Sequence, residues 1–208
     1  MKRKDRYDVS GLPEAEFQPG SRGKVLRNKL GITSKAEMDR AEALALERAV
    51  DLFVRTYDKG HRFTVSDIRW MHQKWLGDIY EWAGQYRNVN MSKGGFPFAA
   101  AGQIPKLMDE LEKGALNRGT PCSFKDEDRV IESLAEVHTE LVLIHPFREG
   151  NGRLARVVSS LMALQAGKQL VFGKIVSDRK EEYFAAVRAG LRRDYEPMGR
   201  VFRSLLAV

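Results

Sequence analysis

Apolar side chains along most of the chain recur at the spacing of amphipathic helices. From Ser34 to about Tyr57 they return every three or four residues, and Ser34 followed by Glu37 matches a capping box at the start of this helix. The same period predicts further helices over residues 66–80, 102–116, 126–143, 151–166, 178–192 and 195–206. The segment 168–176 fits either a strand or a connector. The pattern predicts a mainly helical fold without internal repeats.

One segment breaks the helical period. Val89 and Met91 precede the pair Gly94-Gly95, and Phe96 and Phe98 follow it. Apolar positions that alternate on both sides of a glycine turn are typical of two short strands. We therefore expect a β-hairpin over residues 88–98, which we call the flap.

The first part of the chain has a different character. Residues 1–32 mix charge with Gly and Pro and show no sustained period, which predicts an extended arm or a short helix with loops. A chain of 208 residues with 43% hydrophobic residues is long enough for one sizeable core. We therefore divide the chain into a basic N-terminal arm, residues 1–33, and a single domain, residues 34–208.

The net charge of +7 lies largely in this arm. Residues 1–30 hold eight basic and four acidic side chains, so they contribute 8 − 4 = +4. A basic arm can bind nucleic acid or can simply be solvated. Because no aromatic residues alternate with the charges at the start of the arm, nucleic acid is not the expected partner. A DNA-associated regulatory or partner-binding module remains the alternative from a different functional class.

The cysteine count and the apolar runs indicate the compartment. Cys122 is the only cysteine, which excludes an intrachain disulfide and a cysteine zinc cluster. The basic start lacks the apolar run of a signal peptide, and no stretch approaches the roughly 18 apolar residues of a membrane span. We expect a soluble, cytoplasmic protein without a membrane partner.

The densest group of chemically active side chains is HPFREGNGR, residues 145–153, between two predicted helices. Pro146 ends the first helix, and glycine and asparagine then allow a tight turn that opens the next one. Backbone N–H groups at a helix N-terminus form an anion site. Arg153 and Arg156 are three residues apart and reach the same mouth. Two guanidinium groups beside such a turn suit a polyphosphate.

Two further side chains of this stretch add catalytic chemistry. Glu149 would repel a phosphate unless a divalent cation lay between them, which predicts Mg²⁺. His145 titrates near neutrality and is a candidate general base. Each residue alone has an ordinary structural explanation, but their occurrence together in nine positions favours a site. The other histidines are weaker signals: His61 and His72 fit surface or packing roles, and His138 lies on a helix face beside the site.

The stretch HPFREGNGR with Leu154-Ala155-Arg156 resembles the signature of the Fic (Fido) family, HPFx[D/E]GN[G/K]R followed by a second arginine. Residues 83–108 resemble the family's sequence around its flap, and the resemblance covers roughly residues 34–200. It implies an all-α, mainly helical Fic fold with a small β-hairpin flap.

The family resemblance implies an adenylyltransferase that moves AMP from ATP to a Ser, Thr or Tyr hydroxyl of a target protein. His145 would be the base, and Glu149 would hold Mg²⁺ between the α- and β-phosphates. The nucleotide-binding positions that it implies are Gly150, Asn151 and Gly152 around the phosphates, Arg153 and Arg156 on the outer phosphates, and Phe147 as a core anchor. Because relatives with lysine in place of Gly152 phosphorylate their targets, transfer of phosphate or of another nucleotide remains an alternative.

The resemblance also implies how the target is held. The flap would align the target by main-chain pairing, through Asn90, Met91, Ser92, Lys93, Gly94, Gly95 and Phe96. Phe96 and Phe98 would either clamp the target chain or pack on the core.

Many Fic proteins are inhibited by a helix with the pattern [S/T]xxxE[G/N], whose glutamate pairs with the second motif arginine. Thr33 to Glu37 supplies the first five positions, whereas Met38 departs from the last. Glu37 is therefore either an inhibitory residue or only part of the capping box, with Glu42 or Glu47 as alternatives. A separate antitoxin can supply the glutamate instead, as in a toxin–antitoxin pair. The oligomeric state stays open, with a homodimer as one alternative.

Overall fold

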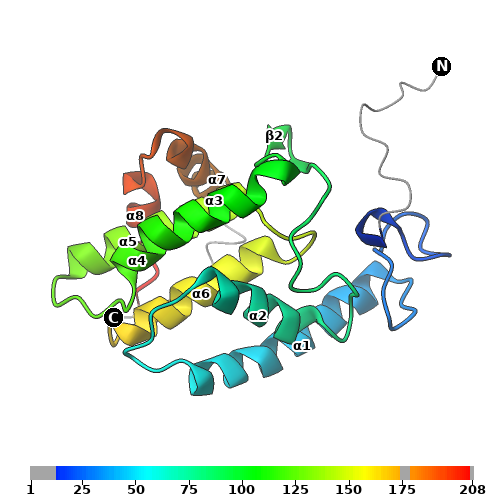
Figure 1. Ribbon diagram of the computed structural model, residues 1–208, viewed down its shortest axis with the longest axis horizontal. Helices are drawn as coiled ribbons and strands as arrows, with labels where there is room; N and C mark the ends of the chain where they lie inside the picture. Colours follow the sequence, from blue (N-terminus) through cyan, green and yellow to red (C-terminus); the bar gives the residue numbers. More distant parts are fainter. Residues whose placement is uncertain (1–12, 174–178, 207–208) are drawn as a thin grey trace.

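The computed structural model of the chain describes residues 13–173 and 179–206, and it has the expected mainly helical architecture. Figure 1 shows α1 and α2 beneath α6, with α3 and α5 above it and α7 and α8 at one end. The helices are α1 (Lys35–Thr56), α2 (Val65–Leu76), α3 (Ile104–Leu111), α4 (Asn117–Gly119), α5 (Glu127–Ile144), α6 (Asn151–Gln165), α7 (Lys180–Ala189) and α8 (Glu196–Arg203).

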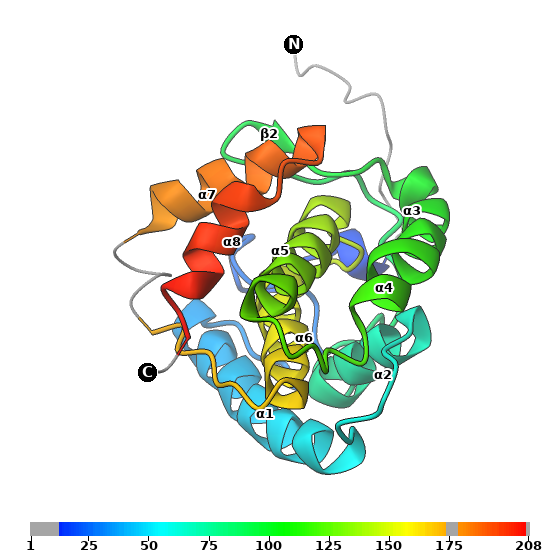
Figure 2. The ribbon, with the colours of Figure 1, turned by 90° about the vertical axis from the view of Figure 1, so that its left-hand side faces the viewer.

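Helix α5 is the centre of the fold. It packs against α3, α6, α7 and α8, and Figure 2 shows the other helices arranged around it. Its buried side chains lie on nearly all sides, from Val130 to Ile144. A helix that is apolar all round is stable only when other elements enclose it. This enclosure places the C-terminal end of α5, and with it His145, inside the domain.

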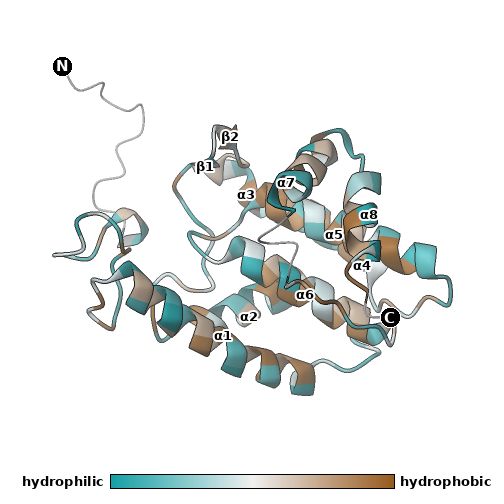
Figure 3. Cartoon of the chain, turned by 180° about the vertical axis from the view of Figure 1, so that it is seen from behind, coloured by the Kyte–Doolittle hydropathy of each residue, from teal (hydrophilic) through white to brown (hydrophobic). Residues whose placement is uncertain are grey.

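Helix α1 is a surface helix that covers α2. Figure 3 shows its turns alternating between hydrophobic and hydrophilic residues, as expected for an amphipathic helix. Ser34 caps its start by accepting a hydrogen bond from the backbone N–H of Glu37, at 3.5 Å. The Trp75 indole of α2 donates to the backbone carbonyl of Glu42, at 2.9 Å. This contact holds α1 against the helix that leads to the site.

Several helix ends differ from the prediction. Helix α2 stops at Leu76 and not at residue 80, because the chain turns at Gly77 and buries Ile79 and Tyr80 from that turn. The helix predicted over 102–116 continues to Gly119 through a π-helical turn, Glu112–Leu116. Helix α8 ends at Arg203, three residues before the predicted end at 206. Of the ambiguous segment 168–176, Leu170 forms an isolated bridge with Leu206, and residues 174–176 lie outside the described residues.

The flap forms as predicted. Strands β1 (Ser92–Lys93) and β2 (Phe96–Pro97) pair antiparallel around Gly94-Gly95, whose positive φ angles of 56° and 78° suit glycine. The described part of the arm, residues 13–33, is irregular and packs onto the domain. Val25 is buried, and the Glu14 carboxylate accepts the backbone N–H of Asn88 at 2.7 Å. The arm therefore touches the base of the flap.

Two buried histidines tie the helices together as uncharged groups. His72 accepts the Gly84 N–H at Nδ1 and donates from Nε2 to the Glu149 carbonyl, at 2.8 and 3.1 Å. His138 belongs to α5, and its side chain is buried in the core of the domain. Burial lowers the pKa of His72 to about 4 and that of His138 to about 3. No helix in the described ranges combines the length and apolarity that a bilayer crossing requires.

These pKa values predict a loss of stability in mild acid. Below pH 6.5 the unfolded histidines gain protons that the folded ones do not, so the unfolded state is favoured as pH falls from 6.5 towards 4. Urea unfolding of the wild type between pH 7 and 4.5 should show this fall, and His138→Gln should show a shallower slope. Equal slopes for both proteins would contradict a buried neutral His138.

Candidate active site

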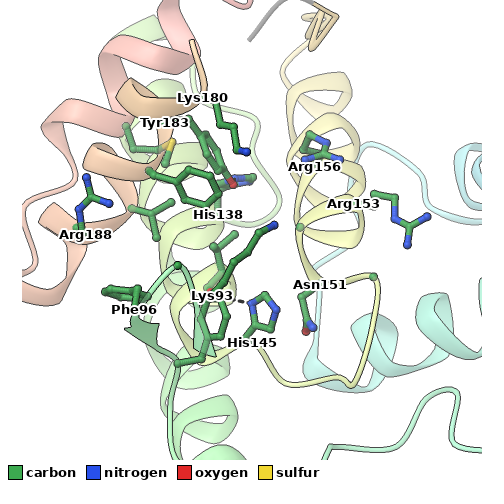
Figure 4. Close-up of a pocket in the computed structure, with 18 of the residues that line it drawn as sticks. Lys93, Phe96, His138, His145, Asn151, Arg153, Arg156, Lys180, Tyr183 and Arg188 are labelled. Carbon is green, nitrogen blue, oxygen red and sulfur yellow. Dashed lines mark hydrogen bonds between the residues drawn. The ribbon is translucent and has the colours of Figure 1, made fainter. Parts of the chain in front are cut away.

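A pocket of about 830 Å³ opens between the flap, the start of α6, and helices α7 and α8. Figure 4 shows that side chains from all of these elements converge on it. Those that carry chemistry are His145, Glu149, Arg156, Tyr183, Lys93 and Arg188. The stretch predicted from the sequence therefore forms one wall of this pocket.

His145 ends α5 in a left-handed backbone conformation, with φ 52° and ψ 57°. This turn directs its ring into the pocket. Its Nδ1 lies 3.2 Å from the Val142 carbonyl, which only accepts, so Nδ1 carries the proton and Nε2 is bare. The Phe98 ring stacks on the imidazole, with centroids 3.6 Å apart. Phe98 therefore packs inward on His145.

The surroundings keep His145 uncharged. Burial lowers its pKa to about 4, and the positive charges of Arg87 and Lys93 act in the same direction. At neutral pH the imidazole is consequently unprotonated. A neutral imidazole with a fixed tautomer is able to accept a proton at Nε2.

The loop after His145 depends on glycine and on internal hydrogen bonds. Gly150 has φ 84°, and a Cβ there would lie 2.6 Å from the Trp75 ring. The Asn151 side chain accepts the Phe147 N–H at 2.8 Å and donates to the Phe147 carbonyl at 2.7 Å. Phe147 is buried and stacks on His72, with centroids 3.9 Å apart. Phe147 is thus a core anchor, and Asn151 holds the loop closed while its backbone begins α6 at the pocket.

Glu149 lies at the pocket with its side chain 44% exposed. One carboxylate oxygen accepts the Gly150 N–H at 2.8 Å and lies 3.3 Å from Arg153. Within the described ranges no three His, Cys, Asp or Glu side chains form a group able to hold a metal. A carboxylate is a hard oxygen ligand suited to Mg²⁺, but one carboxylate needs further oxygen ligands, such as those of a phosphate.

The two motif arginines have different partners. Arg153 donates to Glu42 at 2.6 Å, and its guanidinium lies 4.7 Å from the Trp75 ring centroid. Glu42 is buried and also accepts the Tyr80 hydroxyl at 2.6 Å. For Arg156, the described part of the chain offers no carboxylate within salt-bridge distance. Figure 4 shows Arg156 on the pocket side of α6 and Arg153 extending away from His145.

A chain of hydrogen bonds fixes the direction of the Tyr183 hydroxyl, which the sequence did not single out. Ser159 donates to the Ala155 carbonyl at 2.9 Å, so its oxygen accepts from His138 Nδ1 at 3.0 Å. The uncharged His138 then accepts the Tyr183 hydroxyl at Nε2, at 2.9 Å. Burial raises the pKa of Tyr183 to about 12. Towards the pocket, the Tyr183 oxygen offers only lone pairs. Nothing local in the sequence marks Tyr183, because the helical period places it only on a helix.

The flap contributes five of its seven predicted residues to the pocket lining: Met91, Ser92, Lys93, Gly94 and Phe96. The Asn90 side chain instead accepts the Ala101 N–H at 2.9 Å, next to the flap. The Lys93 Nζ lies 5.6 Å from the centroid of the Phe184 ring in α7. The flap and α7 therefore meet across the mouth of the pocket.

The structure does not bring Glu37 to the motif arginines. Glu37 is exposed in the first turn of α1 and does not line the pocket. Glu47 is exposed as well. Glu42, five residues after Glu37, makes the arginine contact, but to the first motif arginine and not to the second.

Comparisons with known proteins agree with this geometry. The profile of the Fic/DOC family matches residues 62–163. The chain is 31% identical over 189 residues to the protein adenylyltransferase VbhT of Bartonella schoenbuchensis, covering 88% of this chain and 37% of that protein. It is 29% identical to the probable protein adenylyltransferase Fic of Escherichia coli, covering 88% of each chain.

A solved structure has the same fold. The N-terminal Fic domain of a putative cell filamentation protein from Bartonella quintana, with bound ADP, superimposes with a TM-score of 0.70 at 25% identity. The match covers 88% of this chain and 90% of that one. With the complete motif at the pocket, the matching profile and this shared fold, the chain belongs to the Fic/DOC family.

Proposed function

We propose that this protein is an adenylyltransferase that transfers AMP from ATP to a hydroxyl side chain of a target protein. The observation that carries the proposal is His145, whose Nε2 is bare and which lines the same pocket as the loop at the start of α6. Relatives that align over most of this chain carry the name protein adenylyltransferase. The residues of the pocket supply a base, an anion site and space for a nucleoside.

In this reaction His145 Nε2 removes the proton of the target hydroxyl. The hydroxyl oxygen forms a bond to the α-phosphorus of ATP, and the bond from this phosphorus to the bridging oxygen breaks, releasing pyrophosphate. The backbone N–H groups at the start of α6 stabilise the phosphate charge. Arg156 binds an outer phosphate, and Arg153, which Glu42 already holds, shapes the α6 side of the loop.

Mg²⁺ fits this site through Glu149. The exposed carboxylate at the mouth of the anion site provides the hard oxygen ligand, and the nucleotide would complete the coordination. The bound ion would neutralise charge on the phosphates. Without it, Glu149 would repel them.

The far end of the pocket supports a nucleoside with an exocyclic amino group. Phe172, Val187 and Phe202 make this part apolar, which suits a base. Tyr183 presents only lone pairs there, so it favours a ligand that donates an N–H. Adenine offers such a donor, so this part of the pocket favours ATP as the nucleotide.

For regulation, we propose a glutamate from a separate partner, as in a toxin–antitoxin pair, acting on Arg156. Arg153 and Arg156 are among the lining residues of an apolar groove of about 220 Å³ between α1 and α6, and this groove is where we propose that the partner binds. Glu37 remains a candidate only if α1 rearranges. We further propose the cytoplasm as the compartment, since it supplies ATP and keeps a thiol such as Cys122 reduced.

The first test is His145→Ala with ATP labelled on the α-phosphate, incubated with Mg²⁺ and a cell lysate. Loss of the base should lower label transfer by about 10²–10⁴-fold, while binding of an ATP analogue stays within about twofold. His61→Ala, which removes a histidine hydrogen-bonded to Asp67 away from the pocket, is the matched control. If the target gained label from γ-labelled but not from α-labelled ATP, the transferred group would be phosphate and not AMP.

Tyr183→Phe tests the nucleoside end of the pocket. Wild-type protein should prefer ATP over inosine triphosphate, which lacks the amino group, by about tenfold, the value of one hydrogen bond. The variant should lose this preference while retaining transfer from both nucleotides. If Tyr183→Phe still preferred ATP over inosine triphosphate to the same degree, Tyr183 would not recognise the base.

A pair of substitutions on α1 tests the glutamates. Glu42→Gln removes one partner of a buried ion pair and should lower the free energy of unfolding by about 1–3 kcal/mol without raising activity. Glu37→Gly should leave transfer unchanged, because Glu37 is exposed. Increased transfer by Glu42→Gln, or by Glu37→Gly, would assign that glutamate to inhibition.

A further inference from the structure

Arg87 is a fully buried arginine that contacts main-chain oxygens and no carboxylate. It is 1% exposed, and among the described residues no acidic side chain lies within salt-bridge distance of it. Its guanidinium donates to four backbone carbonyls: His145 at 2.7 Å, Val89 at 2.5 Å, Ala99 at 2.6 Å and Ile144 at 3.4 Å. Such a cage compensates a buried cation through several charge-assisted hydrogen bonds.

These four carbonyls belong to two functional segments. Ile144 and His145 are the end of α5, where the catalytic base turns into the pocket. Val89 lies in the flap, and Ala99 directly follows it. One planar guanidinium thus joins the main chain of the base to both ends of the flap.

Neighbouring contacts make the same connection. The Arg87 N–H donates to the Pro146 carbonyl at 2.9 Å, and the Ala99 N–H donates to the Leu143 carbonyl at 3.3 Å. Between them, Phe98 stacks on the His145 ring. The phosphate loop is held by other bonds, chiefly those between Asn151 and Phe147.

We propose that Arg87 is a positioning residue that fixes the flap and His145 relative to each other, so that a hydroxyl aligned by the flap meets the base. The inference rests on the proposed function. A displacement of about 1 Å at a reacting group costs about 10²-fold in rate. Because the phosphate loop has its own bonds, Arg87 acts on the acceptor side of the reaction and not on ATP binding.

The test is Arg87→Lys, which retains the charge but replaces the fork with a single ammonium that cannot span four carbonyls. The matched control is Arg69→Lys, because the Arg69 Nε also donates to a backbone carbonyl, that of Gly84 at 3.0 Å, away from the flap. We expect Arg87→Lys to lower kcat/KM for the target about 100-fold, with the Kd of an ATP analogue within twofold. Arg69→Lys should match the wild type.

Two outcomes overturn the inference: undiminished kcat/KM in Arg87→Lys, or ATP binding that weakens in parallel with transfer. If the wild type itself transfers nothing from ATP, the proposed function fails. Amide hydrogen exchange then tests, without any activity, whether Arg87 holds the flap in place. Exchange over residues 89–99 that is at least tenfold faster in Arg87→Lys than in Arg69→Lys supports the positioning role. Equal exchange in the two variants rejects it.

Discussion

The left-handed turn at His145 is the constraint on which the site depends. A residue with a Cβ seldom adopts this backbone, and here it persists because the chain is held on both sides of it. Helix α5 packs against five other helices, α3, α4, α6, α7 and α8, and Pro146 prevents the helix from continuing. The turn lets one histidine give its carbonyl to Arg87 and its ring to the pocket. The packing of α5 in the core therefore also fixes the position of His145 at the pocket.

The surrounding polar groups have little freedom to change direction. His72, His138 and His145 are each held in one tautomer by a carbonyl, an N–H or a hydroxyl, and burial keeps all three uncharged. The charged side chains of the pocket are consequently arginines, lysines and two glutamates, Glu149 and Glu181. A pocket with more basic than acidic side chains and with neutral histidines suits an anion.

Features that depend on neighbouring residues could be predicted from the sequence. The stretch 145–153 predicted the loop and the helix that follows it, and the glycine pair at 94–95 predicted the flap turn. Contacts between distant segments could not be predicted in this way. Glu42 is 111 residues from Arg153 and Arg87 is 58 from His145, and no spacing rule relates such pairs. The end of α2 was also misplaced, because tertiary burial of Ile79 and Tyr80 in a turn outweighs helical periodicity.

The two motif arginines show why the same residue type acquires different roles. In sequence both suit a phosphate, but Glu42 is buried beside Arg153 and cannot leave its pair without an uncompensated charge in the interior. Arg153 thereby joins α1 to α6, whereas Arg156 faces the pocket. An anion that binds here meets one guanidinium already neutralised and one that is not. Arg153 thus fixes the start of α6 against α1, while Arg156 is available to an anion in the pocket.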